Sequence, residues 1–253
     1  MNRTPTLLLL LALVAAPSIA YEASNGDTAA DAARINARLG IEYMKQGQVA
    51  IAREKIDKAL QQNPRDPGVQ MSAGLLYEQL REPKVAERHY RQALKLEPDN
   101  PEAQNALGAF LCRNGQAKQG EEVFLEAARN PLYRTPEVAY TNAGVCARRN
   151  GRLDKSEEYL RLAVSQRSQY SEALLQMAGV SFERGNFLQA RAFLQRYLGM
   201  APASAEVLLL GYQVEKALGD AAAADDFSGR LRRQFPNSPE ARILDSPSAG
   251  SVP

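Results

Sequence analysis

Few side chains in this sequence are of the kinds that commonly do chemistry in proteins. Among its 253 residues there is one histidine, His89, and there are two cysteines, Cys112 and Cys146. A Ser–His–Asp arrangement for acyl transfer needs a histidine base, but His89 lies in the stretch "AERHYRQAL", among charged residues typical of a solvated helix face. A metal site needs several ligands at short spacing, which this set does not supply. We therefore predict no catalytic residue, no metal ligand and no cofactor.

The charge of the chain argues against some classes of partner. Its formal net charge is +2 at pH 7, with 24% charged and 45% hydrophobic residues. This balance is that of an ordinary folded protein, and it gives no reason to expect nucleic acid or an anionic membrane as a partner. Arg148, Arg149 and the stretch "LRRQF" (residues 231–235) could contact phosphate, but such residues are more typical of solvated helix faces.

The first twenty residues, "MNRTPTLLLLLALVAAPSIA", have the layout of a secretory signal peptide. Arg3 precedes an apolar run from Leu7 to Ala16, and small residues follow at Ser18 and Ala20. This layout predicts cleavage after Ala20. The alternative is a retained transmembrane anchor, which is disfavoured because the apolar run is too short to span a bilayer comfortably. The remaining chain is then expected to be exported and soluble, in a compartment where disulfides persist.

Beyond this leader, the sequence repeats itself about every 34 residues. Small anchor residues recur with spacings of 34, 34, 36, 34 and 33, at Gly40, Gly74, Gly108, Gly144, Ala178 and Gly211. A second small residue follows each anchor after twelve positions, and a bulky one follows after sixteen, at Ile56, Tyr90, Phe124, Leu160, Leu194 and Phe227. This is the tetratricopeptide pattern of a helix (helix A), a tight turn and a second helix (helix B).

Each residue type in the repeat has a physical role. The small anchor lets helix A approach helix B closely, and the bulky residue fills the space between successive pairs. We predict an all-α, right-handed superhelical solenoid of about six tetratricopeptide repeats over residues 33–240. A flexible lead is expected at residues 21–32 and a disordered tail at residues 241–253. Six repeats leave no residues for a separate catalytic domain, so we predict a protein that is not an enzyme.

The two cysteines fall on helix A of adjacent repeats. Cys112 lies four residues after Gly108, and Cys146 lies two residues after Gly144. In an exported protein, thiols on neighbouring stacked helices are candidates for a disulfide. The alternative is two small buried hydrophobic residues, because free cysteine often lies in a core. The same junction carries two extra residues within "NPLYRTPEVAYTNAGVC" (residues 130–146), which are expected to enlarge the loop between repeats 3 and 4.

Stacked tetratricopeptide pairs curve, and helix A lines the concave side that usually receives an extended peptide or a helix. Projecting that geometry onto this sequence predicts a groove whose apolar and polar residues suit a peptide backbone. The alternative for any one of them is packing between helices. The predicted groove residues are Ile41, Met44, Leu75, Asn105, Ala109, Thr141, Val145, Arg148, Leu175, Phe182 and Tyr212.

Several stretches also resemble a known family. These are "ALGAFLCRNGQ", "NPLYRTPEVAYTNAGVCARRNG", "FLQARAFLQRYL", "EVLLLGYQVEKALGD" and "LRRQFPNSPEA". Together, over residues 33–240, they resemble the type IV pilus biogenesis and stability proteins of the PilF/PilW family. The resemblance implies a six-repeat periplasmic pilotin, located at the inner face of the outer membrane. Such a protein binds the outer-membrane secretin and promotes its assembly or localisation. Cys112 and Cys146 match the paired cysteines of many members.

The sequence departs from this family in one respect. Members typically carry a lipidated cysteine directly after the signal peptide, whereas this chain reads "LVAAPSIAYEAS" there and has no cysteine before Cys112. The resemblance then implies that any association with the membrane is indirect, for example through the secretin. The alternative function is that of a periplasmic tetratricopeptide scaffold for another cell-envelope complex.

Overall fold

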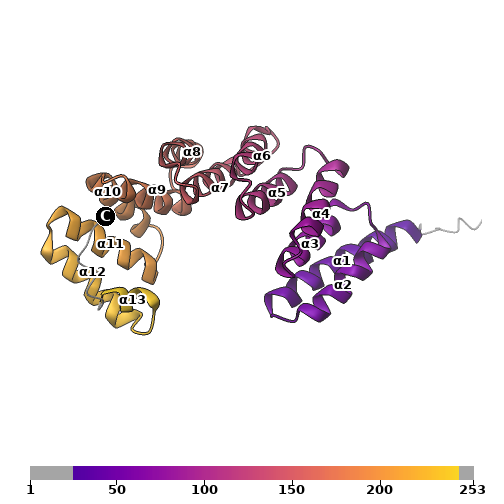
Figure 1. The fold of residues 1–253 in the computed structure, drawn as a ribbon, viewed down its shortest axis with the longest axis horizontal. Coiled ribbons are helices and arrows are strands. Elements are labelled where there is room, and N and C mark those ends of the chain that lie inside the picture. The colour runs from indigo at the N-terminus through magenta and orange to yellow at the C-terminus, as the bar shows by residue number, and fades with distance from the viewer. Residues whose placement is uncertain (1–24, 245–253) are drawn as a thin grey trace, which may run out of the picture.

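The computed structural model describes residues 25–244, which fold into thirteen α-helices with no strand in that range (Figure 1). The helices are α1 (Asn25–Lys45), α2 (Val49–Gln62), α3 (Pro67–Gln79), α4 (Pro83–Leu96), α5 (Pro101–Arg113), α6 (Ala117–Arg129), α7 (Pro136–Arg149), α8 (Leu153–Gln166), α9 (Ser171–Glu183), α10 (Phe187–Leu198), α11 (Ala205–Leu218), α12 (Ala221–Gln234) and α13 (Pro239–Leu244).

The first twelve helices form six consecutive pairs, and the short α13 packs against α11 and α12. The predicted all-α solenoid of six tetratricopeptide repeats is therefore confirmed. Helix α1 begins at Asn25, so residues 25–32 of the expected lead are helical; three of them are alanine, the strongest helix former. Helix α13 likewise includes residues 241–244 of the expected tail. The predicted signal peptide (residues 1–20) and residues 21–24 and 245–253 lie outside the described residues.

The odd-numbered A helices form the inner wall of an open arch. Neighbouring A helices contact each other, from α1 with α3 through to α9 with α11, whereas no two B helices from α2 to α12 do. Because one layer is closely spaced and the other is splayed, the array must curve toward the A helices. Figure 1 shows this directly, with α5, α7 and α9 on the inner side of the arch and α6 and α8 on the outer side.

Close approach of the two helices within a repeat depends on the predicted anchor positions. A Cβ added at Gly74 would lie 2.7 Å from the ring of Tyr90, and Tyr90 is fully buried. In repeat 3 both crossing residues are glycine, and a Cβ on Gly120 would lie 2.8 Å from the carbonyl oxygen of Gly108. Real Cβ atoms do not occupy such positions, so these crossings have no room for a side chain.

The turns between helices A and B use a left-handed residue in five of the repeats, and this residue is glycine. In repeat 2 the same place is taken by Arg81, with φ of 59°. A left-handed conformation costs a residue with a Cβ roughly 1–2 kcal/mol. Repeat 2 therefore folds with a strained turn that its neighbours avoid.

At three junctions an ion pair or a disulfide joins adjacent inner helices, and we call these contacts the inner ties. Arg113 on α5 donates two hydrogen bonds of 2.6 and 3.0 Å to Glu78 on α3. Cys112 on α5 is bonded to Cys146 on α7, with 5.8 Å between their Cα atoms. Helix α7 is tied to α9 through Arg148 and Glu183. All three ties join residues 34 or 35 positions apart, so they recur at almost the same height in successive repeats.

None of the helices within residues 25–244 is both long and apolar enough to cross a membrane.

We predict that Gly74→Ala lowers the free energy of unfolding by about 2–4 kcal/mol, because the new methyl group overpacks the site against Tyr90. Gly199→Ala is the matched control: its Cβ would meet only backbone oxygens at 3.6 Å, and the residue is already right-handed. Urea unfolding followed by circular dichroism measures both variants. Equal loss of stability in the two would contradict the assigned crossing.

We predict that the Cys112–Cys146 bond contributes about 3–4 kcal/mol, since it closes a loop of 34 residues in the unfolded chain. Reductant should therefore lower the melting temperature of the protein. A Cys112→Ser/Cys146→Ser variant should melt below the untreated wild-type protein whether or not reductant is present. Its melting temperature should not respond to reductant. Alkylation and mass spectrometry of the untreated protein should find no free thiol; two free thiols would disprove the bond.

Candidate partner-binding groove

The longer loop between repeats 3 and 4 is hydrogen-bonded to α5 on the inner wall. It spans residues 130–135, two residues more than the preceding junction at residues 97–100, as the sequence predicted. The hydroxyl of Tyr133 accepts a 2.6 Å hydrogen bond from Nδ2 of Asn105 on α5. Asn142 on α7 in turn donates to Oδ1 of Asn105 at 3.4 Å. Burial raises the pKa of Tyr133 above the usual value of a tyrosine.

One hollow on the inner wall is a cavity of about 220 Å³ between α7, α9 and α11, here called the Arg148 pocket. Three of the predicted groove residues line it: Arg148, Leu175 and Phe182. It is completed by residues of α9 and α11 that combine apolar side chains with carboxylates and amides: Gln176, Gly179, Glu183, Glu206, Leu209, Leu210 and Gln213.

Arg148 lines this pocket and is held in a fixed orientation. Its Nε and Nη2 atoms donate to Oε1 of Glu183 at 2.9 and 2.7 Å, and Nη1 donates to Oε1 of Gln176 at 2.9 Å. A Cβ on Gly179 would lie 2.6 Å from Nη2, so the guanidinium lies directly against the α9 backbone. The side chain of Arg148 keeps 28% of its surface exposed, and its planar group remains available to a ligand.

A second hollow of about 180 Å³ adjoins the disulfide between α5 and α7. Ala109 and Val145, both predicted groove residues, line it together with Arg113, Asn142 and Arg149. The two hollows place alternating apolar and hydrogen-bonding groups along the middle of the inner wall. Such a surface suits an extended segment whose side chains enter pockets while its backbone meets polar groups.

The other predicted groove residues have different surroundings. Leu75 is exposed, at 42%, whereas Met44 packs against the cluster that contains Ile56. Ile41 is partly buried, and Tyr212 lies beneath the ammonium group of Lys216, 5.6 Å from its ring centre.

The prediction was wrong for Thr141, which is only 2% exposed. Its hydroxyl donates to the carbonyl oxygen of Glu137, one turn earlier in α7, at 2.7 Å. This bond satisfies the hydroxyl inside the helix, so Thr141 faces the packed interior and presents nothing to a partner.

Sequence reasoning missed the residues that orient Arg148. Glu183 lies 35 residues after Arg148, so a carboxylate one repeat later was a usable signal. Gly179 directly follows Ala178, which already supplies the small anchor residue of this repeat. The extra glycine was therefore a signal of close contact with another group. The α11 side of the pocket had no comparable signal, because Leu209 and Leu210 read as ordinary packing residues.

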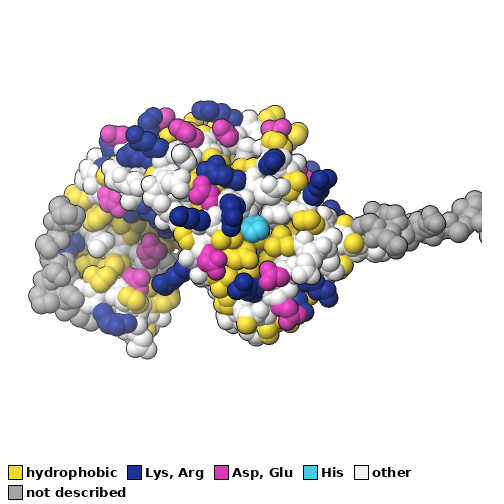
Figure 2. All heavy atoms as spheres, turned by 45° about the vertical axis from the view of Figure 1, so that its right-hand side comes forward, with side chains coloured by type: hydrophobic (Ala, Val, Ile, Leu, Met, Phe, Trp, Pro, Cys, Tyr) yellow, Lys and Arg dark blue, Asp and Glu magenta, His cyan; other side chains and the backbone are white. Residues whose placement is uncertain are grey.

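The lone histidine lies at the surface, as the sequence suggested: Figure 2 shows its side chain in cyan, near Lys and Arg side chains, although part of the ring is buried. The ring of His89 stacks on Tyr77, with centroids 5.3 Å apart and planes 4° apart, and its Nδ1 donates to Oε1 of Gln70 at 2.7 Å. Burial, more than the charge of Arg88, lowers the pKa of His89. Within residues 25–244, no three His, Cys, Asp or Glu side chains are grouped so that they could hold a metal ion.

Comparison with known proteins agrees with this geometry. One tetratricopeptide repeat model matches residues 67–110, and a second matches residues 37–86, 113–172 and 147–205. The type IV pilus assembly protein PilF of Pseudomonas aeruginosa is 24% identical over 203 residues, which are 80% of this chain and 81% of PilF.

Solved structures give the same result. The structure of PilW, described as a widely conserved type IV pilus biogenesis factor, superposes with a TM-score of 0.76 at 29% identity, covering 85% of this chain and 98% of PilW. The structure of Pseudomonas aeruginosa PilF has a TM-score of 0.72 at 23% identity, covering 88% and 99% of the two chains. The chain therefore belongs to the tetratricopeptide repeat family and is homologous to the type IV pilus assembly protein PilF.

Proposed function

We propose that this protein is a non-catalytic periplasmic adaptor of type IV pilus biogenesis. It binds the outer-membrane secretin through its concave groove and promotes assembly or localisation of the secretin. The homology to PilF and the match to PilW along nearly the whole of that structure support a role in pilus biogenesis. The resemblance of the sequence to pilotins supports the secretin as the partner.

The Arg148 pocket is the single observation that carries the binding mechanism. Leu175, Phe182 and Leu209 offer an apolar floor for one side chain of the partner. Arg148 and Gln213 at its edge offer hydrogen bonds to backbone carbonyls or to a carboxylate. These groups position a peptide and supply no nucleophile with an adjacent base, so the pocket fits binding better than turnover.

Two features support the periplasm as the compartment. The first twenty residues have the layout of an export signal. The bond between Cys112 and Cys146 also belongs to a compartment where disulfides persist.

Affinity capture of the protein without its predicted leader, from a detergent-solubilised envelope of its own host, tests this function. The pilus secretin is expected as the dominant partner in the mass spectrum. A different envelope complex in its place would contradict the proposal and would favour the alternative scaffold function.

We predict that Arg148→Ala and Gly179→Ala each weaken capture of the secretin at least about tenfold, equivalent to about 1.4 kcal/mol. Gly179→Ala keeps every charge but displaces the guanidinium, since its methyl group would lie 2.6–2.7 Å from three guanidinium atoms. Arg161→Ala is the matched control, because Arg161 pairs with Glu157 within the outer helix α8. Unchanged affinity of the two pocket variants, with normal circular dichroism spectra, would exclude the Arg148 pocket as the site.

A further inference from the structure

In two of the inner ties, an arginine and a glutamate occupy the same pair of positions in neighbouring repeats. Glu78 lies four residues after the anchor of repeat 2, and its partner Arg113 lies five residues after the anchor of repeat 3. Arg148 and Glu183 stand in the same relation across repeats 4 and 5, with the two charges exchanged. We call these places the first and second tie positions. An ion pair across a junction therefore needs opposite charges at these two positions.

The junction between repeats 3 and 4 departs from this pattern. Its first tie position is Cys112, which is bonded to Cys146, and its second tie position is Arg149. The disulfide thus occupies the place from which a carboxylate would pair with Arg149. Arg149 is exposed, and its side chain has no ion pair or hydrogen bond within residues 25–244.

Arg149 differs in this respect from the other cations at the second tie position. In repeat 1, Lys45 pairs with Glu42 at 2.7 Å. In repeat 6, the ammonium group of Lys216 lies 5.6 Å from the ring centre of Tyr212. In repeat 3 the cation is the arginine of the tie already described. Each of these cations has a partner in the chain, whereas Arg149 is left available to another molecule.

Arg149 and both cysteines line the hollow of about 180 Å³ between α5 and α7, which we call the disulfide hollow. The charged residues that line it are Arg113 and Arg149, and none of its lining residues within 25–244 carries a carboxylate. Arg113 is already bound to Glu78, so the charge of Arg149 remains uncompensated. A concave site with an unpaired positive charge favours an anionic group.

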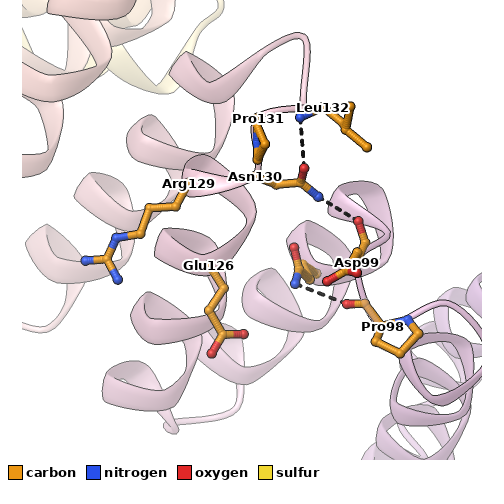
Figure 3. Close-up of a pocket in the computed structure, with 8 residues that line it drawn as sticks. Pro98, Asp99, Glu126, Arg129, Asn130, Pro131 and Leu132 are labelled. Carbon is orange, nitrogen blue, oxygen red and sulfur yellow. Dashed lines mark hydrogen bonds between the residues drawn. The ribbon is translucent and has the colours of Figure 1, made fainter.

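The walls of the disulfide hollow are fixed before any partner arrives. The Cys112–Cys146 bond holds α5 to α7, and Asn142 on α7 also donates a hydrogen bond to an asparagine of α5. On the loop side of the same junction, Nδ2 of Asn130 donates to the carbonyl oxygen of Asp99 at 2.8 Å (Figure 3). A side chain that enters the hollow therefore meets a preorganised site, which lowers the cost of binding.

A larger cavity on the loop side of this junction has the opposite charge. Its volume is about 630 Å³, and its charged lining residues are Asp99, Glu126 and Arg129 (Figure 3). Carboxylates therefore outnumber cations there, whereas the disulfide hollow has cations alone. An anionic side chain that approaches this part of the array is attracted to the disulfide hollow and repelled from the larger cavity.

We propose that the disulfide hollow binds the carboxylate of a glutamate or aspartate side chain of the partner. This carboxylate accepts hydrogen bonds from the guanidinium of Arg149, as Glu78 does from Arg113 one junction earlier. The methylene stem of the partner's side chain packs on Ala109 and Val145, which line the hollow. The inference rests on the proposed function, because it assigns one subsite of the concave groove and requires an acidic residue in the segment bound there.

The probe for a first test is Nα-acetyl-glutamic acid α-amide, added to the ¹⁵N-labelled protein without its predicted leader and followed by NMR. Saturable shifts are expected for the side-chain amide of Asn142 and for the backbone of Val145 and Arg149. Nα-acetyl-glutamine amide has nearly the same shape without the charge, and we expect it to bind at least about tenfold more weakly. Equal binding of the two probes, or shifts spread over arginines elsewhere, would overturn the proposal.

This test does not require the secretin, so it separates the subsite from the proposed function. Binding of the probe without capture of the secretin would keep the subsite and reject the secretin as the partner. Capture of the secretin without binding of the probe would reject the subsite and keep the proposed function.

Arg149→Gln should weaken binding of the glutamate probe at least about tenfold, because it removes the charge that the carboxylate meets. The variant should fold normally, since Arg149 has no ion pair or hydrogen bond to lose within the described residues. Arg38→Gln is the matched control: it removes the same charge from an exposed position on α1 and should leave binding unchanged. Wild-type affinity in Arg149→Gln would overturn the assignment.

A second pair of variants supplies the carboxylate from within the chain. Cys112→Glu/Cys146→Ser restores opposite charges at the two tie positions, so the new carboxylate should occupy Arg149 and weaken binding of the probe at least about tenfold. Cys112→Ser/Cys146→Ser also lacks the disulfide but offers no carboxylate, and it should still bind the probe. Equal affinity of these two variants for the probe would contradict the proposed pairing with Arg149.

Discussion

The structure depends on one steric constraint, the near contact of two helices at a small residue in each repeat, which is glycine in five of the six repeats and Ala178 in the other. At Gly40, Gly144 and Gly211, as at Gly74, a Cβ would come within 2.5–2.7 Å of the bulky residue sixteen positions later. The bulky side chain can lie flat across the crossing only because nothing projects there. It then packs against the next repeat as well, as Tyr90 does against Phe110. Each repeat thus obtains its core from its neighbours.

This constraint explains which features could be predicted from the sequence. The crossing requires particular residue sizes at fixed spacing. The repeats, their number and the position of the enlarged loop could therefore be predicted from the sequence. The orientation of Thr141 and the seat of Arg148 on Gly179 could not. Both depend on how far each repeat is rotated relative to the next. A shift of one position along α7 decides whether a side chain faces the interior or the groove.

Arg148 and Gln104 differ in how their hydrogen bonds are completed. Arg148 receives Glu183 and Gln176 from the following repeat, which fixes its geometry and leaves one face for a ligand. Gln104 donates to the carbonyl oxygen of Pro98, whereas the equivalent Gln70 also accepts from His89 within its own repeat. Equivalent positions of a repeat protein can therefore differ in how their polar side chains are satisfied.

The inner ties also have a mechanical consequence. Straightening the arch must lengthen its inner wall, because the A helices lie on the shorter side of the curve. The pairs Glu78–Arg113 and Arg148–Glu183 can stretch or exchange with water, but the Cys112–Cys146 bond is inextensible. The disulfide therefore restrains the curvature at the centre of the array, between α5 and α7. Flexing of the superhelix is concentrated in the repeats on either side of this junction.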